Sequence, residues 1–552
     1  MSNFDKLLAK VTLNPYDFST WTGLLELSDK HEDANKYREI FDQFLELFPY
    51  CYGYWKKYAE LEKHKHSREE ALKVYKRGIA AIPLSIDLWI AYIETFAETN
   101  QTQPDFEVKM RQLYEQAIDM AGLEFRSDPL WENYISWETS SNRLIEARNL
   151  YERLLAIPTQ LYFQNWDSFK RLIEENSLKD LFSSEEIAPY HAKVDAKAAK
   201  AVEAGLYMGL LLPGDDEPDA DTNQPRCYFI SFEEEETLKQ MIVNSREKIY
   251  QATYQQIMKR WYFEDKIRRP YFHVKLLDDV QVINWSEYLS FEIAELQRLN
   301  QMNESQKEQL YGSHAGSKRV RVLFERCVIA CALYEHIWIR YAKYLETQEN
   351  DVESAFRVFF RAANIHLRNK PTVFLHWALF LDRHPELLTR KDLVPMQGHR
   401  DMVGWPIMPI QKEANLGLNP NQNVYPGKSL DLMTALEKRV PNSALVCSRR
   451  CDFMRRSGAS LTELVMVLRS GINRLRYSAT EQYKRAYEVR GTSASISAQK
   501  FLHLSQQTRA GAAFLACKLA RLFLHLVPPQ EGIPKWKLLL ETAYKPTTQP
   551  PP

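Results

Sequence analysis

The order of apolar and polar residues early in the chain follows a helical period, most clearly in the stretch that ends at Pro83. Trp55, Tyr58 and Glu62 occupy positions i, i+3 and i+7, so they lie on one stripe of a helix. A second apolar stripe, which includes Tyr75, repeats at helical spacing until Pro83 stops it. Because two short helices joined by a charged turn cannot bury their apolar faces alone, this stretch predicts one unit of a stacked array.

The same aromatic pattern recurs along the chain. Trp21, Trp55 and Trp89 are spaced by 34 residues, and the combination W-x₂-Y-x₃-E appears again from Trp131 and from Trp285. A fixed period of this length indicates stacked helical hairpins, so we predict an all-α fold, an α-solenoid in two arrays with these residues in its core. The predicted structural repeat positions are Trp21, Trp55, Tyr58, Glu62, Tyr75, Trp89, Tyr92, Tyr114, Trp131, Tyr134, Glu138, Arg148, Tyr151, Trp166, Trp285, Tyr288, Glu292, Trp338, Tyr341 and Trp377.

Three glutamates of this pattern, Glu62, Glu138 and Glu292, would share the buried stripe with the aromatic residues. Burying a carboxylate is costly unless the carboxylate is hydrogen-bonded. We therefore expect each of them to accept hydrogen bonds from a nearby arginine or tyrosine of the repeats.

Breaks in the pattern predict how the chain is organised. One long helix is expected to connect the two arrays, because glutamates would lie at its positive end and basic residues at its negative end. Six prolines and four glycines between 382 and 427 indicate either an insertion or an aberrant splice product, and a polar insertion is expected at about 477–510. The predicted regions are an N-terminal repeat array (1–207), an acidic disordered loop (208–230), a long connecting helix (231–270), a second repeat array (271–381), a Pro/Gly-rich irregular insertion (382–427), divergent C-terminal helical repeats (428–545) and a disordered tail (546–552).

Charge and composition narrow the class of function. The chain has 72 basic and 72 acidic residues, and this balance argues against a protein whose whole surface neutralises nucleic-acid phosphates. No apolar stretch is long enough to span a bilayer, no secretory signal is recognisable, and seven cysteines do not form a disulfide framework. The motifs of zinc proteases, serine hydrolases and dinucleotide-binding enzymes are missing. We expect a soluble intracellular protein that is not an enzyme and has no catalytic, cofactor-binding or metal-binding residues.

One segment has the composition of an RNA-binding patch. Basic residues at the end of the predicted connecting helix alternate with three aromatic residues, and this combination binds single-stranded RNA through charge and stacking. The alternative interpretation is a helix end with a buried aromatic face. The candidate residues for contact with RNA or a partner are Lys259, Arg260, Lys266, Arg268 and Arg269.

The repeat sequence itself is similar to that of a known family. The pattern W-x₂-Y-x₃-E, followed by A-R-x₂-Y-E-R-x-L from Ala147, resembles the half-a-tetratricopeptide (HAT) repeat of RNA-processing scaffolds, and especially the HAT scaffolds associated with the U1 small nuclear ribonucleoprotein (snRNP). Tetratricopeptide repeats have a similar period, but their W-x₂-L-G-x₂-Y pattern is missing. The similarity is strong over residues 14–380 and patchy over 428–545.

The resemblance implies a function that the composition does not show. It implies a nuclear, non-enzymatic scaffold of pre-mRNA splicing that supports U1 snRNP association and recognition of the 5′ splice site through protein–protein contacts. It also implies a homodimer through the C-terminal array, indirect or weak RNA contact, and no membrane association. Two alternatives remain: a HAT scaffold of another RNA-processing complex, for 3′-end cleavage or ribosomal RNA processing, and a direct RNA-binding protein that uses the basic segment.

Overall fold

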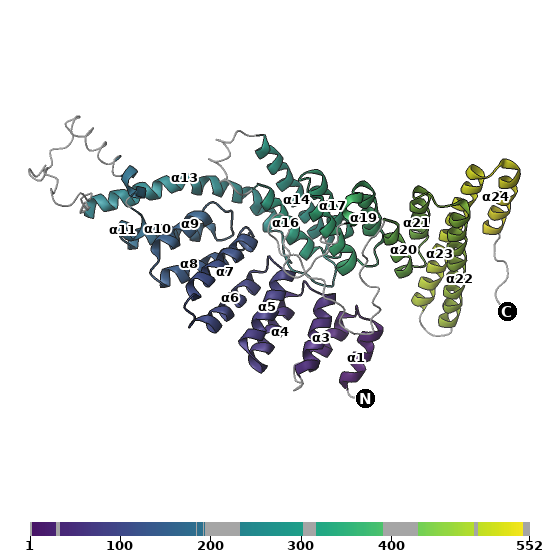
Figure 1. The fold of residues 1–552 in the computed structure, drawn as a ribbon, viewed down its shortest axis with the longest axis horizontal. Coiled ribbons are helices and arrows are strands. Elements are labelled where there is room, and N and C mark those ends of the chain that lie inside the picture. The colour runs from purple at the N-terminus through teal and green to yellow at the C-terminus, as the bar shows by residue number, and fades with distance from the viewer. Residues whose placement is uncertain are drawn as a thin grey trace, which may run out of the picture.

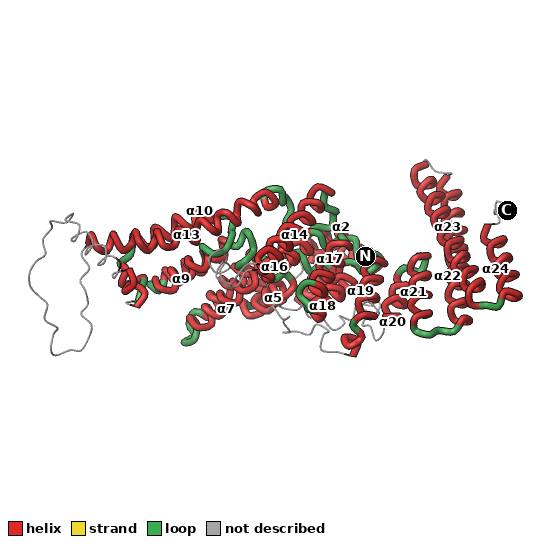
Figure 2. Tube along the Cα trace, turned by 90° about the horizontal axis from the view of Figure 1, so that it is seen from above, coloured by secondary structure: helices red, strands yellow, loops and turns green. Residues whose placement is uncertain are grey.

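The computed structural model describes residues 3–28, 34–183, 185–190, 193, 232–301, 316–389, 429–490 and 495–544. Within these residues the chain forms helices and connecting turns and no β-strand (Figure 1 and Figure 2). The expected all-α solenoid is therefore confirmed. The predicted acidic loop (208–230), the predicted tail (546–552) and residues 390–427 of the predicted insertion lie outside the described residues.

The first array is a row of short helices joined by tight turns and stacked side by side (Figure 1). Its hairpin α4–α5 corresponds to the stretch that begins at Trp55 and ends at Pro83, and Ser67 caps α5 by accepting a hydrogen bond from the Glu70 amide at 3.3 Å. The helices are α1 (Asn3–Leu13), α2 (Phe18–Ser28), α3 (Ala34–Leu47), α4 (Tyr52–Lys65), α5 (Arg68–Ala81), α6 (Ile86–Asn100), α7 (Phe106–Ala121), α8 (Asp128–Ser140), α9 (Leu144–Leu154), α10 (Tyr162–Glu175) and α11 (Leu178–Leu181).

A hydrogen bond from the indole of three tryptophans explains why proline and tryptophan recur together at the start of this array. The indole N–H of Trp55 donates to the Pro49 carbonyl at 2.8 Å, and that of Trp89 donates to the Pro83 carbonyl at 2.8 Å. Trp21 makes the same bond to the residue six positions before it, at 2.7 Å. A buried indole N–H needs an acceptor, and the proline turn that ends one unit supplies it to the next unit.

A single helix, α13 (Phe232–Glu264), follows the first array and has 33 residues, which corresponds to a length of about 50 Å. It is not a free linker. Its residues Leu238 and Ile242 are fully buried, and its Tyr250 stacks on Tyr162 of α10 with the ring centres 4.8 Å apart. The helix therefore closes the end of the first array before it leads into the second.

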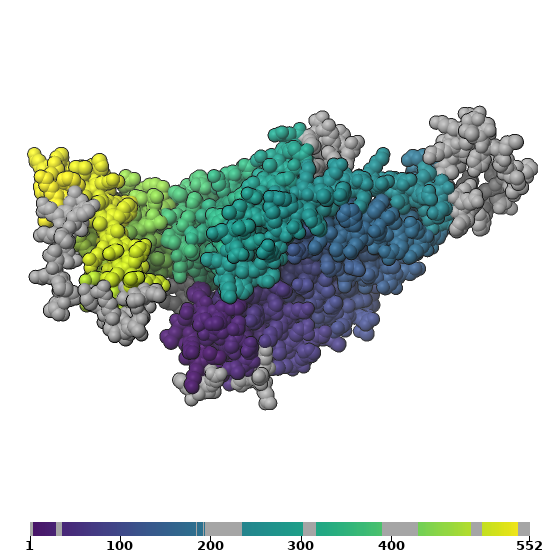
Figure 3. Space-filling model, turned by 180° about the vertical axis from the view of Figure 1, so that it is seen from behind, coloured from purple at the N-terminus to yellow at the C-terminus, as the bar shows by residue number. Residues whose placement is uncertain are grey.

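The second array lies along the first instead of extending it end to end (Figure 1 and Figure 3). Side chains from both arrays belong to one hydrophobic core, and the rings of Tyr50 and His366 lie 4.2 Å apart across the boundary. The sequence did not predict this lateral packing. The elements of the second array are α14 (Asp279–Asn300), α16 (Gly316–Ala330), α17 (Glu335–Thr347), α18 (Val352–Arg361), the π-helix η1 (Ala362–His366), α19 (Pro371–Arg383) and the 3₁₀ helix η2 (Pro385–Thr389).

The unit that begins with α19 is completed by a helix from beyond residue 428. Helix α20 (Ser429–Arg439) packs on α19, and its Leu432, Met433 and Leu436 belong to the same core as Phe374. The second helix of this unit is thus displaced along the sequence, and the solenoid continues through α20 into α21 (Ala444–Arg456).

The chain ends in three further helices, α22 (Leu461–Arg490), α23 (Ser495–Leu526) and α24 (Pro529–Tyr544). The expected polar insertion at about 477–510 is wrong, because α22 and α23 run through almost all of it and pack along each other. Polar side chains take part in this packing: the Ser505 hydroxyl donates to the Ala479 carbonyl at 2.8 Å, and the Thr508 hydroxyl donates to Gln482 at 3.0 Å.

Candidate functional site: the joints of the scaffold

The predicted repeat positions lie inside the molecule. Tyr92 and Tyr151 are half-buried and pack against the core, and Arg148 hydrogen-bonds Glu186 at 2.8 Å. These side chains build the scaffold and do not form a partner-binding surface. The fully or almost fully buried members are Trp21, Trp55, Tyr58, Glu62, Tyr75, Trp89, Tyr114, Trp131, Tyr134, Glu138, Arg148, Trp166, Trp285, Tyr288, Glu292, Trp338, Tyr341 and Trp377.

One four-residue contact recurs at three places in the described part of the chain where a unit meets the first helix of the next. The last helix of one unit supplies an arginine and, three positions later, an aromatic residue. The first helix of the next unit supplies a tyrosine and, four positions later, a glutamate. The arginine pairs with the glutamate, and the aromatic ring stacks on the tyrosine. We call this contact the inter-unit clasp. The three complete clasps are Arg38 and Phe41 with Tyr58 and Glu62, Arg111 and Tyr114 with Tyr134 and Glu138, and Arg260 and Phe263 with Tyr288 and Glu292.

The geometry of the clasps is consistent from one to the next. The Nε atom of the arginine lies 2.7 Å from Glu62, 2.8 Å from Glu138 and 2.5 Å from Glu292. The stacked ring centres are 5.0, 4.5 and 4.9 Å apart, in the same order. All three buried glutamates therefore accept hydrogen bonds from an arginine, as we expected from the cost of burying them, and Glu62 also accepts one from Tyr37 at 3.0 Å.

A fourth joint keeps the cation and the stacked rings but moves the carboxylate. Phe324 of α16 stacks on Tyr341 of α17 with the ring centres 4.7 Å apart. Arg321, three residues before Phe324, pairs with Asp351 at 2.7 Å and also with Glu349. The acid comes here from the turn after α17, where a leucine occupies the usual glutamate position.

The charged state of these carboxylates follows from the competition between burial and hydrogen bonding. Burial acts to raise the pKa of Glu62, but hydrogen bonds from Arg38 and Tyr37 outweigh it and hold the pKa below its ordinary value. The pKa of Glu138 is lowered in the same way, with burial opposed by hydrogen bonds from Arg111 and Arg143. Glu62 and Glu138 are thus ionised at neutral pH.

A second charged cluster joins the two arrays. Arg326 of α16 is buried and reaches two carboxylates, Glu124 of the first array at 2.9 Å and Glu264 at the end of α13 at 2.5 Å. Burial raises the pKa of Glu124, and the charge of Arg326 opposes that shift. One cation therefore holds together the first array, the connecting helix and the second array.

The basic segment at the end of α13 is only partly a surface. The prediction that Arg260 contacts RNA or a partner is wrong, because Arg260 is buried in the clasp with Glu292. Lys259 is exposed and lies 3.6 Å from Glu295, Arg268 is exposed, and Arg269 donates to the Lys275 carbonyl at 2.8 Å. The ammonium of Lys266 lies 3.4 Å from the centre of the Tyr262 ring.

The described residues were compared with the side-chain arrangements of metal sites, membrane-spanning helices and disulfides. No three His, Cys, Asp or Glu side chains in this part of the chain lie close enough to hold a metal ion, and none of its helices is long and apolar enough to cross a membrane. The cysteine pairs Cys327 with Cys331 and Cys447 with Cys451 are buried and unbridged, and burial raises the pKa of Cys327 well above its ordinary value.

Comparison with known proteins agrees with this architecture. The family model described as PRP39 N-terminal HAT repeat matches residues 5–171, and the model described as PRP39 C-terminal HAT repeat matches residues 258–396. The second match begins at Met258, two residues before Arg260. The end of α13, with the Arg260 clasp, therefore belongs to a repeat.

Several relatives carry the name pre-mRNA-processing factor 39. The human protein is 38% identical over 71% of this chain and 54% of its own length, and the fission yeast protein (Schizosaccharomyces pombe) is 31% identical over 73% of this chain and 62% of its own length. The chain therefore spans little more than half the length of these relatives. Together with the two matched repeat regions, they show that the chain belongs to the pre-mRNA-processing factor 39 family of HAT-repeat proteins.

Proposed function

We propose that this chain is a nuclear, non-enzymatic scaffold that supports U1 snRNP association and 5′ splice-site recognition through protein–protein contacts. The family gives the coarser assignment, a HAT-repeat protein of pre-mRNA processing. The observation that most supports a scaffold is the burial of the repeat residues between the helices. Its signature side chains fix the geometry of the helices and leave the outer faces of the solenoid for partners.

Rigidity is the property that such a scaffold needs. Binding through many modest contacts is efficient only when the contacting groups are already held in place, because ordering them on binding costs free energy. The inter-unit clasps and the Arg326 cluster supply this order, because moving one unit against the next would separate buried charges.

We also propose a homodimer through the C-terminal helices. Helices α23 and α24 expose several large apolar side chains, and apolar patches of this kind are typical of protein–protein interfaces. Replacing Phe514 and Leu538 by aspartate should convert the dimer to a monomer in analytical ultracentrifugation. A monomeric wild-type protein would contradict this proposal. The exposed residues are Phe514, Leu524, Leu526, Ile533 and Leu538.

Recovery of RNA from nuclear extract tests the assignment to U1. The tagged full chain should co-purify with U1 small nuclear RNA and proteins of its particle. The Arg326→Met variant should recover less of both, because its arrays are no longer held in one arrangement. Recovery of 3′-end cleavage factors or ribosomal RNA precursors without U1 would instead favour the other HAT complexes.

Direct RNA binding is the second candidate, and one observation favours it. Tyr262 is 59% exposed beside Lys266, with Lys259 and Arg268 near it on the surface. If these residues bind RNA, filter binding should weaken steeply with salt, because phosphate contacts release counterions. The Lys266→Glu and Arg268→Glu variants should then lose affinity. A weak response that does not depend on salt would exclude this function.

A further inference from the structure

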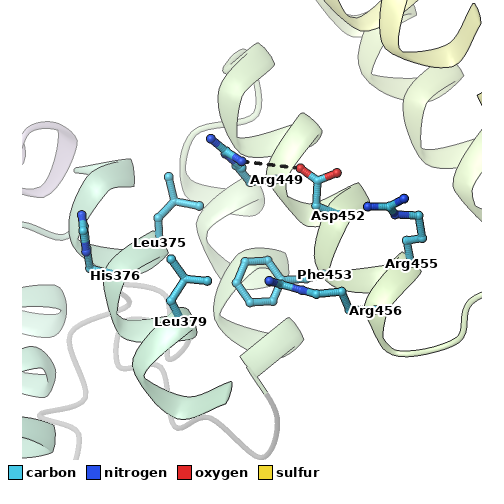
Figure 4. Close-up of a pocket in the computed structure, with 8 residues that line it drawn as sticks. All are labelled: Leu375, His376, Leu379, Arg449, Asp452, Phe453, Arg455 and Arg456. Carbon is cyan, nitrogen blue, oxygen red and sulfur yellow. Dashed lines mark ion pairs between the residues drawn. The ribbon is translucent and has the colours of Figure 1, made fainter. Parts of the chain in front are cut away.

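A groove crosses the first helices of three successive units, α17, α19 and α21. Between α19 and α21 it forms a cavity of about 460 Å³ (Figure 4). Leu375 and Leu379 project into this cavity from α19, and Phe453 comes from α21. Arginines of α21 surround this apolar floor, with Arg449 on one side and Arg456 on the other.

The groove continues over α17. A neighbouring cavity of about 740 Å³ has Ile339 and Leu276 in its apolar lining and Arg340, Lys343 and Lys370 among its polar residues. His376 of α19 lines both cavities, so the two are parts of one surface. Helices α17, α19 and α21 are also direct neighbours in the stack. We call this surface the α17–α21 groove.

The charge of the α17–α21 groove differs from that of the whole chain. The chain is balanced at 72 basic and 72 acidic residues, whereas the described residues that line the groove include six lysines and arginines and two carboxylates, those of Glu335 and Asp452. Three of its cations already have an acidic partner: Lys370 lies 3.3 Å from Glu335, Arg449 lies 3.8 Å from Asp452 and Arg456 lies 3.2 Å from Asp382. Asp452 also pairs with Lys518 at 2.7 Å. The groove therefore has a net positive charge.

Two of these cations are not engaged by any acid in the described part of the chain. Lys343 of α17 and Arg455 of α21 are exposed, and no described carboxylate lies within ion-pair distance of either. Arg340 is held by neutral acceptors, the Ser286 carbonyl and the Ser290 hydroxyl, each at 2.8 Å. An acidic ligand could thus pair with Lys343 and Arg455 without breaking an existing ion pair.

We infer that the α17–α21 groove binds an acidic peptide segment of a partner protein, one in which carboxylates alternate with leucine- or phenylalanine-like side chains. The carboxylates would pair with Lys343, Arg455 and their neighbours, and the apolar side chains would cover Leu375 and Leu379. This inference specifies a partner for one face of the proposed scaffold, and it rests on the proposed function only in that the chain binds proteins.

The floor of the groove favours a peptide over RNA. Single-stranded RNA binds to basic grooves by stacking bases on exposed aromatic faces. Phe453 is the aromatic residue between the arginines of α21, but it is only 3% exposed, and the Arg456 guanidinium lies 4.2 Å from its ring centre. Between α19 and α21 the accessible floor is aliphatic, with Leu379 38% exposed, and suits apolar peptide side chains. Over α17 the lining includes Leu276, which is 65% exposed, together with the half-buried Tyr334 and the exposed His336.

Selection from a phage-displayed library of random peptides tests the inference on the full chain. The recovered sequences should be rich in Asp and Glu next to Leu, Phe or Trp. Synthetic copies should bind the Lys343→Glu, Arg455→Glu double variant on the order of tenfold or more weakly than the wild type in fluorescence polarisation. The matched control is Lys56→Glu with Lys76→Glu, two exposed lysines of the first array, which should leave the affinity unchanged.

A second variant separates the apolar part of the groove from its charge. Leu379→Ser should weaken the same peptides several-fold and change the melting temperature only slightly, because Leu379 is 38% exposed. Affinity that is unaffected by both Leu379→Ser and the charge reversal would place the peptides elsewhere and overturn the inference.

Other outcomes would also overturn it. The inference fails if the recovered peptides have no excess of Asp and Glu, or if no peptide is recovered. It also fails if the groove binds oligouridine in place of peptides. A dimer in light scattering that the charge reversal dissociates would assign the groove to a second copy of the chain. The selection contains no splicing component. Its failure would therefore leave the recovery of U1 RNA from extract unaffected, and failure of that recovery would not decide the selection.

Discussion

The two lateral arrays and the C-terminal helices stack helices by different means. In the arrays, the clasps combine a buried glutamate, which is paired with an arginine, with stacked rings, as between Arg111 and Glu138. In the C-terminal part, α21 approaches α22 and α23 closely because glycines of these two helices face it. A Cβ atom on Gly471 would lie 2.4 Å from the Cys447 sulfur, and one on Gly511 would lie 3.0 Å from the Ala444 Cβ.

This difference has a consequence for function. Clasps fix the angle between neighbouring units through directional hydrogen bonds, so the arrays suit a scaffold of defined shape. Close contact through small residues fixes the distance between α21 and the two long helices, and α23 and α24 expose large apolar side chains such as Phe514 and Leu538. The arrays are therefore the rigid part of the molecule, and the C-terminal helices are the part with an unsatisfied apolar surface.

The largest expected effect comes from the cluster that joins the arrays. Arg326→Met removes the only cation that contacts both Glu124 and Glu264 among the described residues, and it leaves two buried carboxylates. Breaking one side of a buried ion pair costs about 3–5 kcal/mol. Urea unfolding followed by tryptophan fluorescence, which reports mainly on the arrays, should show this loss.

The Arg326→Met effect should depend on pH. The pKa of Glu124 is already raised by burial and should rise further without Arg326. A carboxylate with a raised folded-state pKa loses stability as the pH rises through that value, so the deficit should be larger at pH 8 than at pH 5. The control is Arg68→Met, which breaks the exposed pair with Glu98 and should cost at most about 1 kcal/mol. Equal losses for the two variants would contradict the role of burial.

Breaking one clasp should have an intermediate effect. Glu138→Gln keeps the shape of the side chain but removes the charge that Arg111 and Arg143 share. We expect a loss of about 2 kcal/mol at neutral pH. Because the pKa of Glu138 is lowered in the folded protein, its stabilisation is present above the ordinary pKa of 4.5 and disappears as the pH falls through the lower value. Denaturation at pH 7 and at pH 3 should show the difference shrink, and an unchanged melting temperature at pH 7 would count against the clasp.

A smaller effect is expected where the C-terminal helices touch. Gly471→Ala adds a methyl group against Cys447, and the cost of overpacking is partly offset by the better helix propensity of alanine, so we expect a net loss of about 1 kcal/mol. Adding Cys447→Ala should restore stability by removing the sulfur. Gly53→Ala in α4 is the matched control, because its Cβ would meet nothing within 4 Å. A loss from Gly53→Ala as large as from Gly471→Ala would show that close contact is not the cause.

The smallest effect should come from a single polar contact of α22 and α23. Ser505→Ala removes the hydrogen bond to the Ala479 carbonyl and should cost less than about 1 kcal/mol by circular dichroism melting. A loss as large as that from Glu138→Gln would mean that polar contacts hold α22 and α23 together as strongly as a clasp holds two units.

Much of the array could be predicted from the sequence, because large buried side chains recur at a fixed period. Trp55, Tyr58 and Glu62 mark the first helix of a unit, and the cost of burying Glu62 predicts its arginine partner. The role of Arg260 was missed, although a signal was present: Arg260 and Phe263 have the same spacing as Arg111 and Tyr114, and a W-x₂-Y-x₃-E helix follows each pair.

Other features gave no comparable signal. Lateral packing of the arrays depends on Arg326 and Glu124, which look like ordinary surface residues in the sequence. Helix α20 completes the unit of α19 from beyond residue 428, so the repeat period does not predict it. The sequence predicted a polar insertion at about 477–510 because the buried residues there are small or polar, such as Ala479 and Ser505, and add little hydrophobic periodicity.

The claim that the two arrays form one rigid body is tested most directly by a distance measurement between them. Spin labels introduced through unnatural amino acids at Lys56 of α4 and Lys343 of α17, both exposed, can be measured by double electron–electron resonance. We predict one narrow distance distribution that is the same at low and high salt and that broadens in Arg326→Met. A broad or bimodal distribution in the wild-type protein would contradict the rigid scaffold.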